Sequence, residues 1–337
     1  MQAVRLARYH TGRDKVVRFS GAYHGWWDDV QPGPGNPAEP ACTTLTLREC
    51  HANTLHVLST RSDIACVLVN PLQSMHVNAA APSDSTLMLA GRKAVYDRAT
   101  YTAWLHDLRD VCTQRGIALI FDEVFMGFRL SIGGAQAYFG VQADMVTYGK
   151  TLGGGLPVGV ICGKAAWMKR YRDDRPGDIC FARGTFNAHP YVMGAMNVFL
   201  RHLETTAVQA LYASASRVWQ ERMSRANAAL SQAGYPVAFV GMETVWTLLY
   251  QVPSRYNWML QFYLRDQGIA LSWVGTGRFV FNLSFTEEDF AIFLDRLLCA
   301  CAQMQADGWW WVPEGVNAQR VQRGLFLELL RHKWLTT

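Results

Sequence analysis

Residues 117–123, IALIFDE, decide the fold that this sequence predicts. An unbroken apolar run that ends in an acidic pair is typical of a short strand buried on both faces of a parallel sheet. A second such run, IACVLV, stands at residues 64–69. Between the two, apolar residues recur at helical spacing up to Gly116, namely Tyr101, Trp104, Leu105, Leu108, Val111 and Cys112. Strand, helix and strand together predict a parallel or mixed sheet flanked by helices.

The apolar pattern predicts further elements on both sides of this core. Short strands are expected at residues 15–20, 145–148, 158–162, 246–250 and 279–283. Helices are expected at 1–11, over one long stretch from about 190 to 233, and after Thr286, where TEED is a variant of the capping box. We therefore expect an α/β chain with two domains. A large domain covers residues 1–205, and a small one covers 206–337, including a tail at 299–337.

Half of the 337 residues are hydrophobic and 18% are charged, with a net charge of +5. This composition is that of a globular protein rather than a disordered or fibrous one. The positive residues are scattered among acids, so nucleic acid is not an expected partner. No stretch reaches the roughly 18 apolar residues of a membrane span, and we expect a cytoplasmic protein that does not contact a membrane.

The eight cysteines are expected to be free thiols in a reducing compartment. Several stand inside apolar runs, where a cysteine behaves as a small hydrophobic residue. The densest group of possible metal ligands, Cys42, Cys50, His51 and His56, lacks the paired spacing of zinc sites, so no metal is expected.

Three polar features stand where a small molecule could bind. Asp122 and Glu123 follow the IALIF strand, and ligands of open α/β sheets bind beyond the carboxyl ends of the strands. Lys150 stands in a glycine-rich turn, whose backbone can bend closely around a ligand. Tyr23 and His24 follow the first strand and suit a planar ligand. Each feature also has an ordinary structural interpretation, respectively a helix cap, a solvated turn and core packing.

A phosphate-loop NTPase is an alternative that the order of the motifs disfavours. GKT at residues 149–151 and the acid after the apolar strand imitate the two halves of such a site. The motif requires glycine at position 144, where this chain has Asp144. The acid also precedes the lysine loop here, which reverses the usual order.

The densest motif is LIFDEVFMGFRLSIGGAQAYFGVQADMVTYGKTLGGG at residues 119–155, followed by LPVGVICG. It resembles the core of class III pyridoxal-phosphate aminotransferases, in particular the glutamate-1-semialdehyde aminomutase branch. GAYHGWWDD, GTFNAHP and SFTEEDF follow the family's order, at residues 21–29, 184–190 and 284–290. The resemblance implies the fold-type I transferase architecture, a large domain with a mostly parallel mixed sheet and a small α+β domain. More loosely, the chain resembles the aminotransferase of prodigiosin-type pyrroline biosynthesis, an antibiotic pathway, which acts on an alkyl acyl aldehyde.

The resemblance implies pyridoxal 5′-phosphate as cofactor and assigns roles to several residues. Lys150 matches the lysine that binds the cofactor covalently and then moves the substrate proton. Asp122 matches the acid that binds the pyridine nitrogen and keeps it protonated. Val124 and Tyr23 match the side chains that pack on the two ring faces. His24 and Glu123 match neighbouring polar positions without an assigned role.

Gly184 and Thr185 match a segment that reaches the cofactor phosphate of a partner subunit. The resemblance therefore implies a homodimer with shared active sites. The implied reaction is amino transfer from an amino-acid donor to an aldehyde or ketone. Two alternatives stay open, an aminomutase that moves nitrogen within one substrate and a catalytically silent scaffold domain of the same fold.

The sequence departs from the family pattern in four places. The family has a glycine- and serine-rich phosphate loop before the helix that here begins near Met1, so we expect either a longer protein or an incomplete phosphate site. Asn70 stands where the branch usually has glutamate before proline. Trp26 and Trp27 make the loop after His24 more apolar, which suggests an acceptor with an alkyl portion. The tail with its three tryptophans at 309–311 matches nothing in the family and packs either on the body or on another domain.

Overall fold

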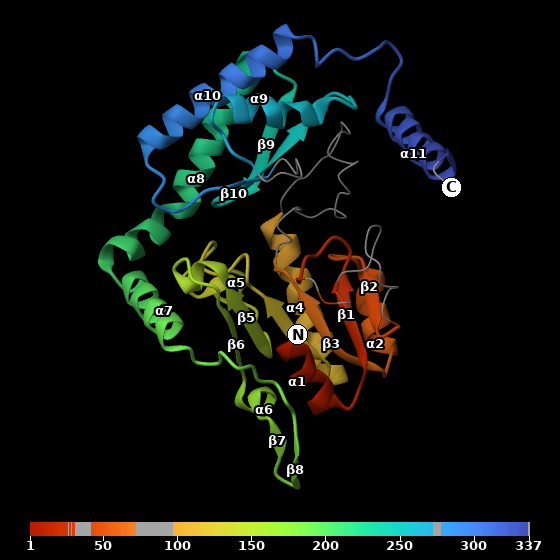
Figure 1. Ribbon diagram of the computed structural model, residues 1–337, viewed down its shortest axis with the longest axis vertical. Helices are drawn as coiled ribbons and strands as arrows, with labels where there is room; N and C mark the ends of the chain where they lie inside the picture. Colours follow the sequence, from red (N-terminus) through yellow and green to blue (C-terminus); the bar gives the residue numbers. More distant parts are fainter. Residues whose placement is uncertain (26, 28, 31–41, 72–96, 272–277, 336–337) are drawn as a thin grey trace. The chain divides into compact units, whose positions relative to one another are not determined.

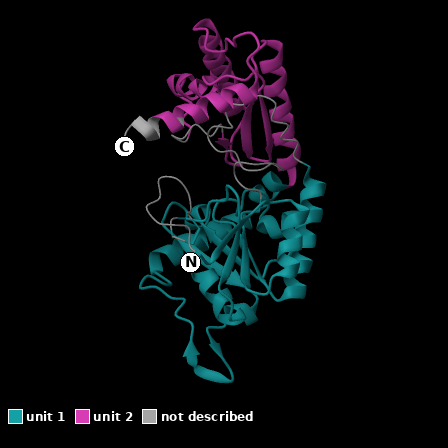
Figure 2. Ribbon diagram, turned by 90° about the vertical axis from the view of Figure 1, so that its right-hand side faces the viewer, with its two compact units in different colours: residues 1–74, 78–81, 97–212 teal, residues 75–77, 82–96, 213–337 magenta. Residues whose placement is uncertain are grey.

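The computed structural model describes two compact units of the chain (Figures 1 and 2). Among the described residues, unit 1 ends at Tyr212 and unit 2 begins at Ala213. The described residues are 1–25, 27, 29–30, 42–71, 97–271 and 278–335. The expected boundary at residue 205 stays a prediction.

Unit 1 is built on a six-stranded sheet with the strand order β2-β1-β3-β4-β5-β6. The strands are β1 Lys15–Phe19, β2 Thr44–Leu47, β3 Ile64–Val69, β4 Ala118–Asp122, β5 Met145–Gly149 and β6 Gly159–Gly163. Neighbouring strands from β2 to β5 are parallel, and β6 is antiparallel to β5. The predicted mostly parallel mixed sheet is confirmed.

Helices cover both faces of this sheet (Figure 1). On one face, α1 Gln2–Thr11 packs its apolar side in a cluster with alternate residues of β3 and β4, among them Leu68 and Ile120. On the other face, the ring of Phe19 in β1 meets Trp104 of α4 Arg98–Arg115 at 5.5 Å between centroids. The smaller helix α2 Ala52–Thr60 packs beside α4. The strands are buried on both sides because side chains alternate along a strand.

The parallel strands bring four loops to one edge of the sheet. β1, β3, β4 and β5 are neighbours in space, so the residues that follow them lie next to one another in the same order. These are the loop to Tyr23, then Asn70, then Asp122 at the last position of β4, and Lys150 directly after β5. The carboxyl edge of a parallel sheet is where such folds bind ligands.

Asp144 links β4 and β5 at the amino-terminal ends of the two strands, opposite the edge that carries Asp122 and Lys150. The residue is 4% exposed, and its carboxylate accepts hydrogen bonds from Leu119 N at 2.9 Å, Arg109 Nη1 at 2.8 Å and Lys164 Nζ at 2.8 Å. Burial raises the pKa of Asp144, but the hydrogen bonds from Lys164, Leu119 and Arg109 outweigh burial and bring that pKa below its usual value. The residue that argued against a phosphate loop is therefore a structural acid.

Asp144→Ala is expected to lower the free energy of unfolding by about 3 kcal/mol, because it leaves Arg109 and a buried N–H without their acceptor. Urea denaturation of the full chain measures this difference. Asp174→Ala is the matched control, since the Asp174 side chain is 71% exposed and is 3.7 Å from its ion partner. The control is expected to change stability by less than about 0.5 kcal/mol. Equal midpoints for the two variants would contradict the structural role.

Unit 2 has an antiparallel sheet in the order β11-β10-β9, covered by helices. Its elements are the main part of α8 Thr206–Gln232, then β9 Val237–Met242, β10 Val245–Tyr250, α9 Leu260–Asp266, β11 Arg278–Val280, α10 Glu287–Ala306 and α11 Ala318–Leu335. Trp246 and Phe290 are fully buried in an aromatic core. Trp309 and Trp310 pack against the same core, so this part of the tail belongs to unit 2.

The capping box at the start of α10 is confirmed. Thr286 Oγ1 accepts from Asp289 N at 3.1 Å, and Asp289 Oδ2 accepts from Thr286 N at 2.9 Å. The single helix expected over 190–233 is wrong, because the structure has two helices, α7 Pro190–Leu203 and α8. Glu204 and Thr205 separate them, and the Thr205 hydroxyl donates to His202 O at 2.7 Å. β11 also ends three residues before the expected strand does.

Several elements lack a strong sequence pattern and were not predicted. They are β2, α2, β9, α9, α11, the short helices α5 Gly134–Phe139 and α6 Ala165–Met168, and the hairpin of β7 Tyr171–Arg172 and β8 Arg175–Ile179. The eight cysteines are free, as expected, although only Cys66, Cys112, Cys180 and Cys301 are buried. None of the described helices has the length and apolar character needed to cross a bilayer.

Candidate active site

Asp122 is the centre of a hydrogen-bonded cluster at the end of β4. Its Oδ1 accepts from Val124 N at 3.2 Å and from Thr147 Oγ1 at 3.1 Å. Its Oδ2 lies 2.7 Å from His24 Nδ1. Burial raises the pKa of Asp122, but the hydrogen bonds, first that from His24, outweigh burial and place the pKa below its usual value. A buried carboxylate that stays ionised at neutral pH is therefore available at this edge.

The loop after β1 is attached to the end of β3 through Asn70. Asn70 Oδ1 accepts from Tyr23 N at 3.1 Å, and Asn70 Nδ2 lies 3.4 Å from His24 Nδ1. The His24 side chain is almost fully buried, whereas Tyr23 is 54% exposed. The structure thus brings His24 to Asp122 and leaves the Tyr23 ring accessible.

Lys150 follows β5, the strand that pairs with β4 in the register Asp122↔Thr147. Its φ is +44°, a left-handed value that costs a non-glycine residue roughly 1–2 kcal/mol and is common at functional sites. Its Nζ lies 5.8 Å from the centroid of the Phe125 ring. A Cβ at Gly149 would lie 3.2 Å from a methyl group of Val124, so Val124 packs directly under the residue before Lys150. The structure therefore brings the Asp122, Val124 and Lys150 segments together.

Glu123 points away from this cluster into the turn before α5. It is fully buried, and its Oε2 accepts from Ala135 N at 2.7 Å. A Cβ at Gly134 would lie 2.3 Å from the same oxygen, which only glycine avoids. Among the described residues Oε1 finds no hydrogen-bond partner. Burial raises the pKa of Glu123 to about 7. Glu123 therefore ties the start of α5 to the residue that directly follows Asp122.

Glu123→Gln is expected to change how stability depends on pH. A carboxyl with a raised pKa binds its proton more tightly in the folded state, so its contribution falls as the pH rises from about 4.3, the unfolded value, through 7. Glutamine keeps an acceptor for Ala135 N and cannot ionise. We expect wild type to lose on the order of 2 kcal/mol more than the variant between pH 5 and 8, measured by urea denaturation. Glu221→Gln, at a 59% exposed side chain, is the control; a parallel loss in wild type and Glu123→Gln would contradict the assignment.

Gly184 and Thr185 lie in an exposed segment between β8 and α7. Gly184 O accepts from Asn187 N at 3.2 Å, which makes a local turn. Within the described part of this chain, neither residue is hydrogen-bonded to the Asp122 cluster. Their implied contact with a partner subunit stays a prediction.

Two residues of the cluster, Asn70 and Thr147, were not identified as site residues from the sequence. Asn70 directly follows the buried strand β3, by the same rule that singled out Asp122. The sequence therefore contained an indication for Asn70, but its relevance to Asp122 depends on β3 lying next to β4 in the sheet. Thr147 had no comparable signal, because it is recognised only through its strand register with Asp122.

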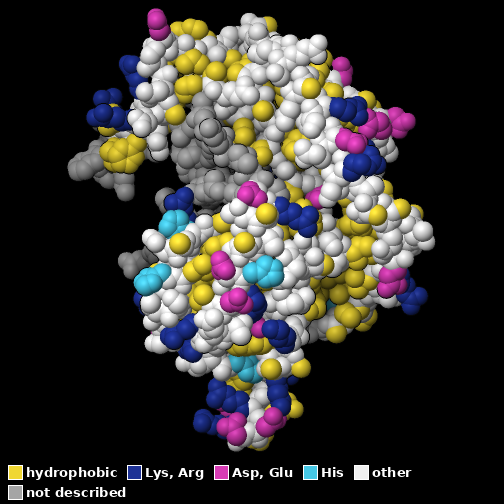
Figure 3. Space-filling model, turned by 180° about the vertical axis from the view of Figure 1, so that it is seen from behind, with side chains coloured by type: hydrophobic (Ala, Val, Ile, Leu, Met, Phe, Trp, Pro, Cys, Tyr) yellow, Lys and Arg dark blue, Asp and Glu magenta, His cyan; other side chains and the backbone are white. Residues whose placement is uncertain are grey.

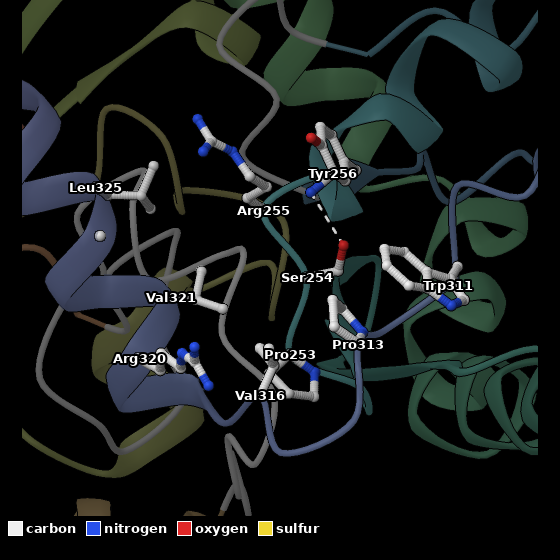
Figure 4. A pocket seen from close by; sticks show the side chains of 11 residues that line it. Pro253, Ser254, Arg255, Tyr256, Trp311, Pro313, Val316, Arg320, Val321 and Leu325 are labelled. Atoms are coloured by element: carbon white, nitrogen blue, oxygen red, sulfur yellow. Dashed lines mark hydrogen bonds between the residues drawn. The ribbon is translucent and has the colours of Figure 1, made fainter.

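A hollow in unit 2 has a different character (Figure 4). It is lined by the 253–256 turn, the connection that includes Trp311 and Pro313, and one side of α11. The lining is mostly apolar, with Arg255 and Arg320 as its charged residues. Among the described residues, those that line this hollow include no carboxylate, lysine or histidine, in contrast to the Asp122 cluster.

Solved structures with the same architecture define the class of fold. An omega-transaminase from Sphaerobacter thermophilus is 24% identical, with a TM-score of 0.73 over 90% of this chain and 71% of that protein. A β-phenylalanine aminotransferase from Variovorax paradoxus is 26% identical, with a TM-score of 0.68 over 90% of this chain and 66% of that protein. The fold is that of the fold-type I transferases.

The family follows from the sequence of the chain itself. The model of the class-III aminotransferases matches residues 97–300, so the chain belongs to the class III aminotransferase family. A glutamate-1-semialdehyde 2,1-aminomutase from Methanococcus maripaludis is 35% identical over 219 residues, which are 60% of this chain and 46% of that protein. The chain spans about half the length of the curated relatives it matches.

Proposed function

We propose that this protein is a pyridoxal 5′-phosphate-dependent aminotransferase that moves an amino group from an amino-acid donor to an aldehyde or ketone. One observation carries the proposal: the ionised, buried carboxylate of Asp122 ends β4, and Lys150 follows the neighbouring parallel strand β5. Membership of the class III family supports the same activity.

The chemistry of the described residues fits this cofactor. A carboxylate has about four acceptor positions, and the described donors to Asp122 are three: His24, Val124 and Thr147. One position therefore remains for a pyridine N–H, and the low pKa of Asp122 favours a cationic ring. The exposed ring of Tyr23 and the apolar side chain of Val124 suit the two faces of an aromatic ring.

The residues of the cluster divide the work between them. When bound, pyridoxal 5′-phosphate supplies an aldehyde for amine exchange and a ring that accepts the electrons released at the substrate carbon. Lys150 would hold it covalently through Nζ and, once the substrate amine has taken its place, accept and return a proton at the substrate carbon. Asp122 would hold the ring nitrogen as a fixed negative charge. Val124 and Tyr23 would orient the ring and exclude water from its faces.

Borohydride reduction of cofactor-supplied protein, followed by peptide mass mapping, tests the proposal. We expect a pyridoxyl group on the peptide of Lys150 and none on that of Lys169, a partly exposed lysine paired with Asp173. An amino-acid donor added before the borohydride is expected to displace Nζ of Lys150 and prevent labelling. Labelling elsewhere, or none, would contradict the proposal and favour a silent scaffold domain of the same fold.

An aminomutase is a second candidate, favoured by the 35% identity with proteins of that name. The two activities differ in what a turnover needs. A transaminase stops after one half-reaction when a single substrate is given without a second one, whereas a mutase completes turnover. Incubation with glutamate-1-semialdehyde alone, with detection of 5-aminolevulinate, distinguishes them.

A narrower proposal is that the acceptor has an alkyl portion and that the protein acts in prodigiosin-type pyrroline biosynthesis. Trp27 does not support the proposal, because its ring packs against the core beside α1. Trp26 lies outside the described residues. The proposal therefore rests on the sequence resemblance alone. The turnover rate is expected to rise with the alkyl chain length of the aldehyde acceptor. A rate that stays constant or falls along such a series would contradict the proposal of an alkyl acceptor.

We also propose a homodimer with shared active sites, because the segment of Gly184 and Thr185 resembles the family segment that reaches the cofactor phosphate of a partner subunit. Large apolar side chains of unit 1 are exposed around the predicted phosphate segment: Phe186 is 79% exposed, Tyr191 79% and Val198 68%. Figure 3 shows apolar surface on the side of unit 1 that carries α7. Such contiguous apolar surface marks interfaces. Light scattering of the full chain is expected to give twice the mass of one chain. Tyr191→Glu places a charge on this apolar surface and is expected to lower the measured mass.

A further inference from the structure

We propose that Asn70 is a positioning residue that holds the Tyr23 ring at the edge of the sheet that carries Asp122. Its side-chain amide attaches the loop after β1 to the end of β3. The inference deepens the proposed function and rests on it for the role of Tyr23 toward the cofactor. It concerns a position at which this chain carries an amide, where the family resemblance leads one to expect glutamate.

Asn70 stands on a rigid part of unit 1. It directly follows β3, whose six residues are all buried, and it is itself 9% exposed. Pro71 comes next, and the residue before a proline is restricted to extended backbone. The side-chain amide of Asn70 is therefore presented from backbone that has little freedom to move.

The loop that carries Tyr23 has more conformational freedom than the strand end. Gly21 has a φ of 78° and Gly25 a φ of 97°, and glycine loses more backbone freedom on folding than any other residue. Tyr23 lies midway between these two glycines and is 54% exposed. A ring at such a position needs a fixed backbone if it is to keep one orientation.

Asn70 supplies a hydrogen bond that fixes this backbone. Tyr23 N donates to Asn70 Oδ1 at 3.1 Å, which orients the peptide group before Tyr23 and with it the Cα–Cβ bond that carries the ring. On its other side, the NH2 group of Asn70 lies 3.5 Å from Asp122 O, at the outer limit of a hydrogen bond. The next residue, His24, contacts Asp122 Oδ2 through Nδ1 at 2.7 Å. Two successive residues of the loop are thus attached to two neighbouring strand ends.

A double-mutant cycle tests whether Asn70 acts through the Tyr23 ring. We expect Asn70→Ala to weaken the binding of pyridoxal 5′-phosphate about fivefold, in line with one hydrogen bond, and Tyr23→Ala to weaken it about tenfold. In the Tyr23→Ala background no ring is left to misplace, so adding Asn70→Ala should change the affinity less than about twofold. A role of Asn70 in overall stability, or toward Asp122 O, would persist in that background and give a roughly fiftyfold loss. Absorbance titration of the full chain measures the four affinities.

Amide hydrogen exchange of the cofactor-free full chain tests the hydrogen bond itself. We expect the Tyr23 N–H to exchange at least about tenfold faster in Asn70→Ala than in wild type, because its acceptor is lost. Asn70→Asp keeps an oxygen at the position of Oδ1 and nearly the same shape, so exchange should stay slow in this variant. Mass spectrometry of the peptide that contains Tyr23 measures the rates.

Asn227→Ala is the matched control for both measurements. Asn227 Oδ1 also accepts a hydrogen bond from a backbone N–H, that of Phe239 at 2.6 Å, but it belongs to unit 2. The control should accelerate exchange at Phe239 and change neither the exchange at Tyr23 nor the affinity for pyridoxal 5′-phosphate.

The outcomes separate this inference from the proposed function. Unchanged exchange at Tyr23 in Asn70→Ala, equally fast exchange in Asn70→Asp, or a fiftyfold loss of affinity in the double variant overturns the inference. Failure of wild type to bind pyridoxal 5′-phosphate rejects the proposed function, and with it the role of Tyr23 toward the cofactor. The exchange rates then decide whether Asn70 holds the loop.

Discussion

Lys150→Arg is expected to yield a folded protein that takes no pyridoxyl label and turns over at least about 10²–10⁴-fold more slowly. A guanidinium stays protonated at any accessible pH, so it can neither bond to the cofactor aldehyde nor accept a proton. The positive charge and the side-chain length are retained, which isolates the loss of the amine. Borohydride labelling with mass mapping and steady-state rates measure the two effects.

Lys169→Arg serves as the control for this substitution. Lys169 also belongs to unit 1, but it makes a surface ion pair with Asp173, four residues along the chain. Its replacement should leave labelling and turnover unchanged. A Lys150→Arg protein that is still labelled, or that retains wild-type turnover, would place the reactive amine at another lysine.

Asp122→Asn should reduce turnover about 10²–10³-fold while leaving the local structure in place. The asparagine oxygen can keep the hydrogen bonds from Val124 N and Thr147, and the amide can face His24, whose Nδ1 then accepts instead of donating. Only the charge is removed. Without it the pyridine nitrogen loses the anion that favours its protonated form, so the electron-accepting power of the ring falls.

Thr147→Val is the informative comparison for Asp122→Asn. It deletes one hydrogen bond to Oδ1 but keeps the carboxylate charge, and we expect less than about tenfold loss, in line with one hydrogen bond. Steady-state rates and circular dichroism of both variants are to be compared. If the two variants lost equal activity, hydrogen bonding to Asp122 rather than its charge would be the essential property.

The sequence predicted the core of unit 1 well, because that core depends on strong local patterns. The fully apolar run of β3 can only be buried on both faces, and Gly116 ends α4 in a left-handed conformation with φ of 60°. The rule that ligands lie beyond the strand ends then pointed to Asp122, and the glycine-rich turn pointed to Lys150, without knowledge of the strand order.

Other features of the fold depend on contacts between residues that are not evident from the spacing of apolar residues along the sequence. The break between α7 and α8 depends on the Thr205 hydroxyl, which bonds back to α7, while the residues around it still have helical periodicity. The edge strand β2 is only partly buried and has no apolar run. The importance of Asn70 follows from the order β1-β3-β4, which places it between two loops that are distant in the sequence.

The candidate site itself was only partly predictable. The cluster brings His24, Asp122, Val124 and Lys150 into one region, and their functional roles remain proposals. The family resemblance groups Glu123 with the cofactor residues, yet its side chain accepts a hydrogen bond from the backbone of α5. Successive residues after a strand commonly point in opposite directions, and the sequence alone did not decide which acid faced the ligand.

The register of β4 against β5 also limits how this protein can change during evolution. Asp122 lies opposite Thr147, and each residue advances a strand by about 3.3 Å while reversing its side chain. One inserted or deleted residue within β4 would therefore turn the carboxylate to the opposite surface of the sheet. Insertions and deletions should consequently be tolerated in the connections that precede β4 and excluded from the strand.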